Sequence, residues 1–251
     1  MFNVSIILTI FNNSKFLSKC IISILKQSYA PKEIILVDDG SADNEAKKIY
    51  KKFKSTKNID FKFYKIKNKG ASGARNFALK KIRYNYFCFF DPDDYMGKNF
   101  IKNKIKIFEK YGGKKIVGVY SNIKFKKKSD VRLNNYQNGW GDFNQIDTIG
   151  HKNGICGSLP TYLFYKPNMP NNIRLDKKIL INEDFDLIIR LLLKKKKVFG
   201  INKFDIIVNL HDYSLTRSIK NNDLIYDNQK KFLPKAYKKK YFSSKELTRR
   251  R

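Results

Sequence analysis

An apolar run that ends abruptly in acidic residues, Phe87–Tyr95 (FCFFDPDDY), constrains this chain more than any other stretch. Aromatic residues fill Tyr86–Phe90 without alternating polar ones, which predicts a strand buried on both faces. Such strands belong to parallel sheets covered by helices, and these sheets bind ligands just beyond the carboxyl ends of their strands. Asp91, Asp93 and Asp94 fall at that position. The run therefore predicts an α/β protein with a polar site at one edge of its sheet.

Three carboxylates so close together repel one another unless a cation joins them. Hard oxygen ligands suit Mg²⁺ or Mn²⁺, which proteins commonly share with the phosphates of a substrate. The alternative is a solvated turn, because Asp and Pro are ordinary turn residues. On these residues alone both interpretations stay open.

Strands and helices alternate along the first half of the chain, which predicts a largely parallel sheet flanked by helices. No GxGxxG follows the first strand and no GxxxxGK[ST] occurs, so two common nucleotide-binding folds are set aside. Helical spacing predicts helices over about 16–25, 46–53, 72–82 and 101–108, the first of them capped by Asn13 or Ser14. Apolar runs predict strands at Val4–Ile10, Glu33–Val37, Phe61–Ile66, Tyr86–Phe90 and Ile116–Ser121.

The regularity fails between Lys124 and Leu159, a polar, glycine-rich and basic stretch that contains the only tryptophan, Trp140. We expect a long irregular loop there, in which Trp140 either lines an acceptor site or anchors the core. Further along, a helix is expected whose apolar face begins at Phe185. The strands expected around it are Thr161–Tyr165, Val198–Ile201 and Ile206–Leu210.

The formal net charge of +31, most of it from lysine, is extreme. Nucleic acid, an anionic membrane surface or a phosphorylated substrate would each explain it, and so would a lysine-rich genome that decorates solvated faces. Hydrophobic residues make up 42% of the chain, enough for a full core. Three widely spaced cysteines without CxxC spacing, and no stretch near the roughly 20 apolar residues of a membrane span, predict a soluble or peripheral protein of the reducing cytosol.

A second acidic pair, Asp38-Asp39, follows the second predicted strand, and Gly40 after it allows a tight turn. The carboxyl ends of parallel strands meet at one edge, so this pair and the cluster at Asp91 should open on the same side. Such an edge could hold a sugar nucleotide, with acids for base, ribose hydroxyls and metal. Asp38 and Ser41 are also ordinary caps for the helix that follows.

These pieces resemble the inverting glycosyltransferases of family two, which have the GT-A fold. Five short segments in the family's order are far more specific than any one of them. A sixth segment, HDYSLTR (His211–Arg217), is similar to the family's late histidine-serine segment. The five are VSIILTIFN at the start, VDDGSAD (Val37–Asp43), NKGASGARN (Asn68–Asn76), FDPDD (Phe90–Asp94) and NEDFDLIIR (Asn182–Arg190).

The resemblance implies that five of the matching residues bind the nucleotide sugar. Phe11 stands where the family often has a tyrosine beside the nucleobase. Asp39 resembles the acid that reads uracil, and Arg75 matches a position near the nucleotide. Asp91 and Asp93 form the family's DxD motif, which holds ribose and metal.

The resemblance also implies metal ligands and a general base. Mn²⁺ or Mg²⁺ would be held by Asp93, Asp94 and His211, and Asp184 would take the proton from the acceptor hydroxyl. Each role has a structural alternative. An aromatic residue such as Phe11 is more often core, acids at a helix start are ordinary caps, and most single histidines bind nothing.

We therefore predict a metal-dependent inverting hexosyltransferase with a GT-A domain at 1–220 and a basic, mostly helical C-terminal extension at 221–251. It is expected to move one hexose from a nucleotide sugar, a UDP-sugar, to a glycan or glycolipid acceptor in lipooligosaccharide, capsule or related surface polysaccharide assembly. A single addition is expected because the QxxRW motif and membrane spans of the family's processive synthases are missing. We expect a cytoplasmic protein whose basic extension contacts the anionic inner face of the cytoplasmic membrane.

One rival hypothesis is another enzyme, and one comes from another class of protein. A nucleotidyltransferase shares a similar nucleotide-binding core and would release pyrophosphate. A nucleic-acid-binding protein would explain the charge, but the basic residues are spread along the chain and the acid clusters would repel phosphate backbones, so no nucleic acid is expected.

Overall fold

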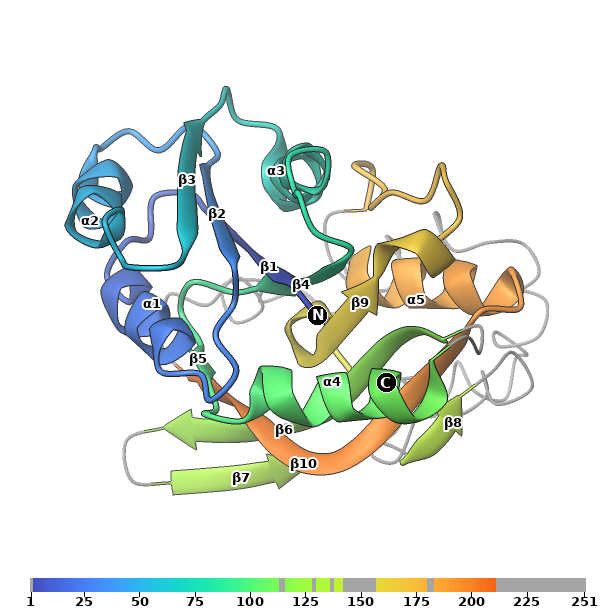
Figure 1. The fold of residues 1–251 in the computed structure, drawn as a ribbon. Helices are drawn as coiled ribbons and strands as arrows, with labels where there is room; N and C mark the ends of the chain where they lie inside the picture. Colours follow the sequence, from blue (N-terminus) through green and yellow to red (C-terminus); the bar gives the residue numbers. More distant parts are fainter. Residues whose placement is uncertain are drawn as a thin grey trace.

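A computed structural model describes residues 2–112, 116–127, 130–135, 138–141, 157–179 and 183–210 of the chain. They build one sheet with helices on both faces (Figure 1). The helices are α1 (Leu17–Leu25), α2 (Glu45–Phe53), α3 (Gly70–Leu79), α4 (Phe100–Tyr111) and α5 (Glu183–Leu193), with 3-10 turns η2 (Leu159–Thr161) and η3 (Lys166–Asn168). The strands are β1 (Val4–Ile10), β2 (Glu33–Asp38), β3 (Asp60–Lys65), β4 (Tyr86–Phe90), β5 (Tyr95–Met96), β6 (Ile116–Lys127), β7 (Asp130–Asn134), β8 (Gly139–Gly141), β9 (Tyr162–Tyr165) and β10 (Lys197–Asn209).

The sheet has the strand order β3-β2-β1-β4-β9-β6-β10-β5, with β7 beside β6 and β8 beside β10. The block from β3 to β4 is parallel throughout, as its strand and helix alternation predicts. β9 runs antiparallel to both β4 and β6, and β6 is parallel to β10. β4, β6 and β10 therefore point the same way, so their carboxyl ends reach the same edge as those of β1 and β2.

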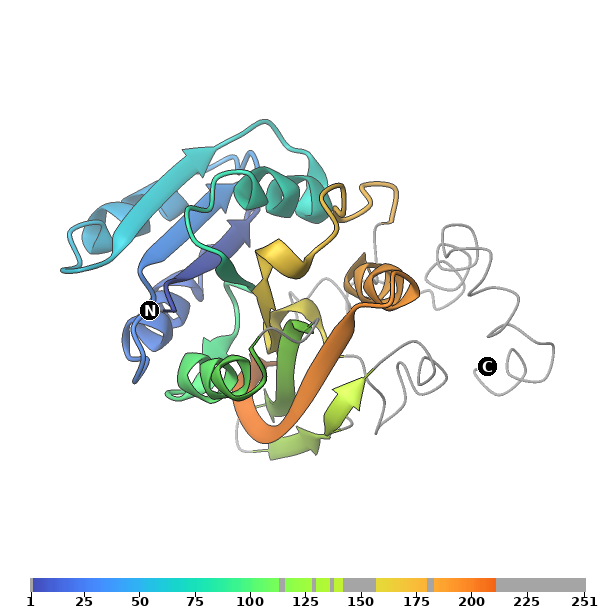
Figure 2. The same cartoon turned by 45° about the vertical axis from the view of Figure 1, so that its right-hand side comes forward.

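β1, β2 and β4 are buried on both faces over nearly their whole length, which confirms the interpretation of these apolar runs. In β4, Phe87 and Phe89 face one core together with α3 and α5, whereas Cys88 and Phe90 face the other core with α1, α2 and α4. Figure 2 shows the teal α3 and the orange α5 on one side of the sheet and the blue α1 and green α4 on the other. Because the alternating residues have an apolar layer on each side, β4 has no polar alternation in its sequence.

The stretch predicted to be irregular, Lys124–Leu159, is partly sheet. β6 continues to Lys127, and β7 and β8 follow within it. The lysines of β6 prevented the prediction of this extension. A strand that leaves the core keeps the two-residue alternation of its side chains but loses its apolar residues.

Two further local expectations were wrong. A single strand, β10, replaces the two expected around Asn202, because register shifts on either side of Phe204 absorb the polar break. Helix α1 begins at Leu17 without a side-chain cap, so neither Asn13 nor Ser14 caps it. The C-terminal extension predicted at 221–251 lies outside the described residues. Among the described helices none is long and apolar enough to cross a bilayer.

A buried carboxylate marks the amino ends of the parallel strands. Glu33, fully buried at the start of β2, accepts hydrogen bonds from Ser5 Oγ (2.5 Å) and from the Arg83 N–H (2.9 Å). Its other oxygen lies 2.8 Å from Lys62 Nζ. Both carboxylate oxygens of Glu33 are thus paired, and a charged group can be buried in a sheet only when it is paired in this way.

We predict that Glu33→Ala lowers the free energy of unfolding by about 2–4 kcal/mol, because the buried Ser5 hydroxyl and the part-buried Arg83 N–H lose their acceptor. Chemical denaturation monitored by circular dichroism measures this. The matched control is Glu45→Ala, since Glu45 pairs with Lys48 on the surface, where both side chains are at least half exposed; its loss should stay below about 1 kcal/mol. Equal losses in the two variants would contradict the prediction.

Candidate functional site

The predicted acids gather at the point where the strand order reverses. From β1 the chain moves outward to β2 and β3 and then returns to β4 on the opposite side of β1. Asp38 and Asp39 come at the end of β2 and Asp91 comes directly after β4, so they flank the carboxyl end of β1. Open α/β sheets bind ligands in the crevice at such a reversal.

The loop after β1 is bonded to the loop after β2, and this leaves Phe11 on the surface. The Asn12 N–H donates to Ser41 Oγ at 2.9 Å, and the Ala42 N–H donates to Asn12 Oδ1 at 2.9 Å. Asn12 takes a left-handed conformation, with φ of 50°. Phe11 is 50% exposed, so the alternative that it belongs to the core is wrong. An exposed ring at this edge can stack on a planar base.

Asp39 is held in a narrow turn against the loop that precedes α3. Its Oδ1 accepts the Lys69 N–H at 2.8 Å, and burial raises the pKa of Asp39 although the N–H groups of Lys69 and Gly70 oppose the shift. Gly40 has φ of +84°, and a Cβ there would lie 2.9 Å from Asn68 N, so only glycine fits this approach.

Asp38 closes the same turn from inside and does not cap a helix. Its Oδ1 accepts the Ser41 N–H at 2.8 Å, and α2 begins after Asn44 without a side-chain cap. The capping alternative for Asp38 and Ser41 is therefore wrong.

Arg75 joins the sheet edge that carries the acids to the start of α5. Its guanidinium donates to Asp91 Oδ1 at 2.9 Å and to the Glu183 carboxylate, and its side chain is 11% exposed. Burial lowers the pKa of Arg75, but the two carboxylates outweigh this and the net shift is upward. Burial likewise raises the pKa of Asp91, and Arg75 opposes that shift. We expected Arg75 near the nucleotide, but its pairing with Glu183 could not be seen from sequence.

The other two acids of the cluster differ from each other. Asp94 is 6% exposed, and its Oδ1 accepts the Asn209 N–H at 3.0 Å from the end of β10. Burial raises the pKa of Asp94 well above its ordinary value, and the charges of Asp91 and Asp93 add to this. Asp93 is half-buried. A cation between these oxygens would relieve the crowding.

The described residues contain no group of three His, Cys, Asp or Glu side chains arranged to hold a metal, and His211 lies outside them. Mg²⁺ sites of phosphate enzymes, however, use one or two carboxylates and complete the shell with water and substrate phosphates. Asp93 and Asp94 fit that kind of donor set.

Asp184 occupies the first turn of α5. Its Oδ1 accepts the Phe185 N–H at 2.7 Å, so a helix-terminus interaction exists as the capping alternative requires. Burial nevertheless raises the pKa of Asp184 to about 6, with a further contribution from the charge of Glu183. A carboxylate with that pKa is mostly ionised at pH 7 and still accepts a proton readily.

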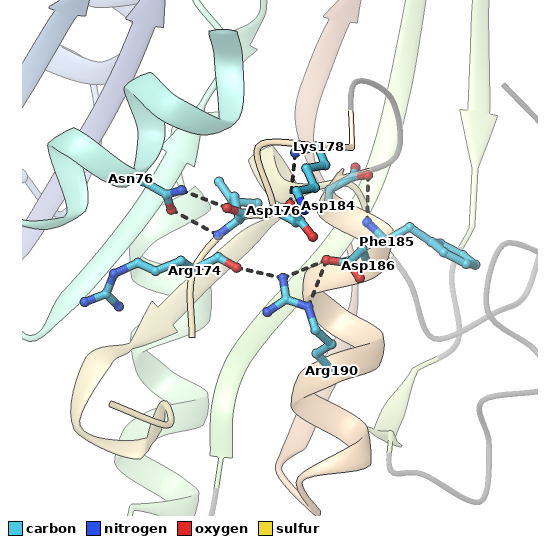
Figure 3. A network of polar contacts seen from close by, with 9 residues as sticks. Asn76, Arg174, Asp176, Lys178, Asp184, Phe185, Asp186 and Arg190 are labelled. Atoms are coloured by element: carbon cyan, nitrogen blue, oxygen red, sulfur yellow. Dashed lines mark hydrogen bonds and ion pairs between the residues drawn. The ribbon is translucent and has the colours of Figure 1, made fainter. Parts of the chain in front are cut away.

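Two groups of hydrogen bonds, made by Asn76 and by Arg190, position the segment before α5 (Figure 3). We call them the clamp, and the sequence did not predict it. Asn76 Nδ2 donates to the Leu175 carbonyl at 2.8 Å, and the Leu175 N–H donates to Asn76 Oδ1 at 3.0 Å. Arg190 donates to Asp186 at 2.6 and 2.8 Å and to the Arg174 carbonyl at 2.7 Å. The positions of Asn76 and Arg190, each at the end of a motif segment, were the available signal.

Trp140 does not reach this edge. It lies in β8, which pairs with the beginning of β10 and so with the opposite end of that strand. Its ring packs against Tyr111 and Phe199, with centroids 5.2 and 5.1 Å apart. Of the two roles considered, the structure supports the core anchor.

We predict that Asn76→Ala lowers the free energy of unfolding by about 2–4 kcal/mol, because it leaves a buried N–H and a buried carbonyl of Leu175 unpaired. Hydrogen exchange should also speed up over 173–179. Asn44→Ala is the control, because Asn44 is exposed and makes no side-chain cap bond. Unchanged exchange over 173–179 in Asn76→Ala would show that the clamp does not hold the segment.

A doubly covered α/β sheet with acids at its strand reversal, an arginine bridging them to a helix terminus, and a carboxylate of raised pKa on that helix define the GT-A class of nucleotide-diphospho-sugar transferase folds. The model of glycosyl transferase family 2 matches residues 5–168, and the chain belongs to this family. This confirms the family and the fold class expected from the motifs.

A curated relative agrees with the family, and solved structures agree with the fold. The minor teichoic acid biosynthesis protein GgaB of Bacillus subtilis is 28% identical over 80% of this chain and 22% of its own length. The crystal structure of S. aureus TarS 1–349 in complex with UDP-GlcNAc has a TM-score of 0.71 at 19% identity, over 94% of this chain and 69% of that one. A Pyrobaculum calidifontis mannosyltransferase in complex with GDP-Man and Mn²⁺ has a TM-score of 0.61 at 13% identity, over 83% and 56%. The chain spans less than two thirds of the curated relatives it matches.

Proposed function

We propose that this chain is a metal-dependent inverting glycosyltransferase that moves one hexose from a UDP-sugar to a glycan acceptor in surface polysaccharide assembly. The observation that carries the proposal is Arg75, which bonds Asp91 at the sheet edge that carries the acids and Glu183 beside Asp184. Asp184, the candidate base, is thus next in sequence to a residue that Arg75 connects to Asp91, one of the acids proposed to bind the nucleotide sugar. Family membership favours this over a nucleotidyltransferase, and the teichoic acid relative and the UDP-GlcNAc complex of TarS support the substrate classes.

The donor would lie across the end of β1. Phe11 offers a ring for the base, Asp39 an acceptor deep in the turn, and Asp91 an oxygen for the ribose. Arg75 neutralises part of the acidic charge, so that a diphosphate can approach.

In an inverting transfer the acceptor oxygen attacks the anomeric carbon from the face opposite the departing diphosphate. Asp184 would accept the proton of the acceptor hydroxyl as the new bond forms, and a pKa of about 6 suits that task near neutral pH. Nuclear magnetic resonance of the product tests the stereochemistry, since inversion must reverse the anomeric configuration of the donor.

A divalent cation, Mn²⁺ or Mg²⁺, would be held by Asp93 and Asp94 and would supply counter-charge for the leaving diphosphate. His211 remains a proposed third ligand. Asn209, two residues before it, is bonded to Asp94. The cytoplasmic location, and the contact of the basic extension at 221–251 with an anionic membrane, also remain proposals.

We predict that Asp184→Asn lowers turnover by about 10²–10⁴ with little change in donor affinity, because asparagine has nearly the same shape but accepts no proton. If Asp184 were only a cap, asparagine would replace it almost without loss. Single-turnover transfer and donor titration separate the two outcomes. Asp176→Asn is the matched control, since Asp176 uses one oxygen to accept the Lys178 N–H at 2.9 Å, a bond that asparagine keeps.

The pH profile gives the same prediction a second readout. The base must be ionised, so the rate of the parent should fall about tenfold per unit as the pH drops below about 6 and should level off above it. The residual rate of Asp184→Asn should lack that limb. A limb that survives in the variant would assign it to another group.

We predict that EDTA abolishes transfer and that Mn²⁺ or Mg²⁺ restores it. Asp93→Ala should lose nearly all activity with weaker donor binding, because the diphosphate loses its counter-charge. Isothermal titration with UDP, with and without metal, measures this. Asp60→Ala at the start of β3 serves as the control, and full activity in EDTA would exclude the metal.

A further inference from the structure

The hairpin of β6 and β7 extends past the body of the sheet. β9 pairs with β6 only at Gly118–Tyr120, whereas β7 pairs with Ile123–Lys127, further along the strand. In the part of the chain that the structure describes, β7 pairs only with β6, so it forms an edge (Figure 1). Exposed edge strands with apolar side chains are normally blunted or covered.

One face of this hairpin combines apolar and basic side chains. Val131 is 55% and Leu133 is 53% exposed, and the other exposed large hydrophobic residues of the described chain lie elsewhere, on α1 and after β1. The register pairs Val131 with Lys126 and Leu133 with Lys124. Directly paired residues share a face, so two lysines stand beside the two apolar side chains. Lys126 is exposed, whereas Lys124 is half-buried with its Nζ 6.0 Å from the centre of the Phe204 ring.

The same hairpin adjoins the edge that carries the acids. β6 runs parallel to β10, whose last residue, Asn209, pairs with Lys126 in the sheet and donates to Asp94 at 3.0 Å. The next residue, Leu210, donates its N–H to the Lys126 carbonyl at 2.9 Å. A surface that binds the hairpin would therefore lie next to the proposed nucleotide-sugar site.

We propose that this face of the β6–β7 hairpin docks the enzyme on an anionic lipid surface. The two apolar side chains enter the interface while Lys124 and Lys126 meet lipid phosphates, a mixture that suits a negatively charged bilayer. A second copy of the chain is a poorer partner, because self-association would bring the same lysines together in a protein of net charge +31. On the proposed sugar transfer, this orientation presents a lipid-linked acceptor at the catalytic edge, but docking itself does not depend on that proposal.

Co-sedimentation of the full chain with phosphatidylglycerol-containing vesicles tests the docking, with phosphatidylcholine vesicles as the neutral reference. Lys124→Gln/Lys126→Gln should weaken binding about 25-fold, since about 1 kcal/mol per cation corresponds to roughly fivefold each. Val131→Ser/Leu133→Ser should weaken it about tenfold or more. Ile22→Ser is the matched control, because Ile22 is a 40% exposed isoleucine on α1, and it should bind like the parent.

Donor hydrolysis should stay unchanged in all of these variants, because none of the altered side chains belongs to the acid cluster. Vesicle binding equal to the parent in both double variants would overturn the proposal, as would equal parental binding to neutral and anionic vesicles. A dimer that dissociates in Val131→Ser/Leu133→Ser, with vesicle binding unchanged, would assign the face to a second copy instead. A parent that binds vesicles but hydrolyses no nucleotide sugar would refute the proposed function and leave the docking intact.

Discussion

The ion pairs of Arg75 are the interaction on which the site depends. An arginine side chain that is 11% exposed would be costly to bury without partners, and Arg75 has two carboxylates from segments far apart in the chain. Asp91 ends β4 and Glu183 begins α5, so the pairing fixes a helix terminus to a strand end. Removing either acid would leave the buried charge of Arg75 with only one carboxylate, so both pairs are needed to join α5 to the end of β4.

This connection would still be loose without the hydrogen bonds beside it. The segment 173–179 contains no regular secondary structure, so its backbone groups need partners from elsewhere. Asn76, the neighbour of Arg75 on α3, supplies a donor and an acceptor to Leu175, much as a neighbouring strand would. Arg190 then ties the helix to the carbonyl of Arg174. α3 thus holds both the approach to α5 and, through Arg75, its first turn.

Sequence predicted the parts of the fold in which burial alone decides the residues. β4 was predicted with its observed ends, because a strand with an apolar layer on both faces needs an unbroken apolar run. The predicted strand ended at Ser121, before the end of β6. Beyond the core a strand does not need apolar residues, and Lys124 and Lys126 occupy it equally well. β10 was divided because a bulge tolerates the polar pair Asn202-Lys203, which reads as a loop. The Asn76–Leu175 bonds join residues 99 positions apart, and no local pattern can announce such a pair.

The common direction of β4, β6 and β10 links these observations. A short antiparallel strand, β9, lies between β4 and β6 and keeps them parallel. If β4 and β6 were instead paired directly and antiparallel, the carboxyl end of β6 would point toward Glu33, at the opposite edge of the sheet. Because the direction is kept, the long β6 can leave the core at the edge where Asp91 and Asp94 lie and carry β7 beyond it. The position of the hairpin is thus a consequence of topology, while its exposed apolar and basic residues are a property of sequence alone. Since the core does not require Val131 and Leu133 to be apolar at more than half exposure, their chemistry is best explained by what the surface contacts.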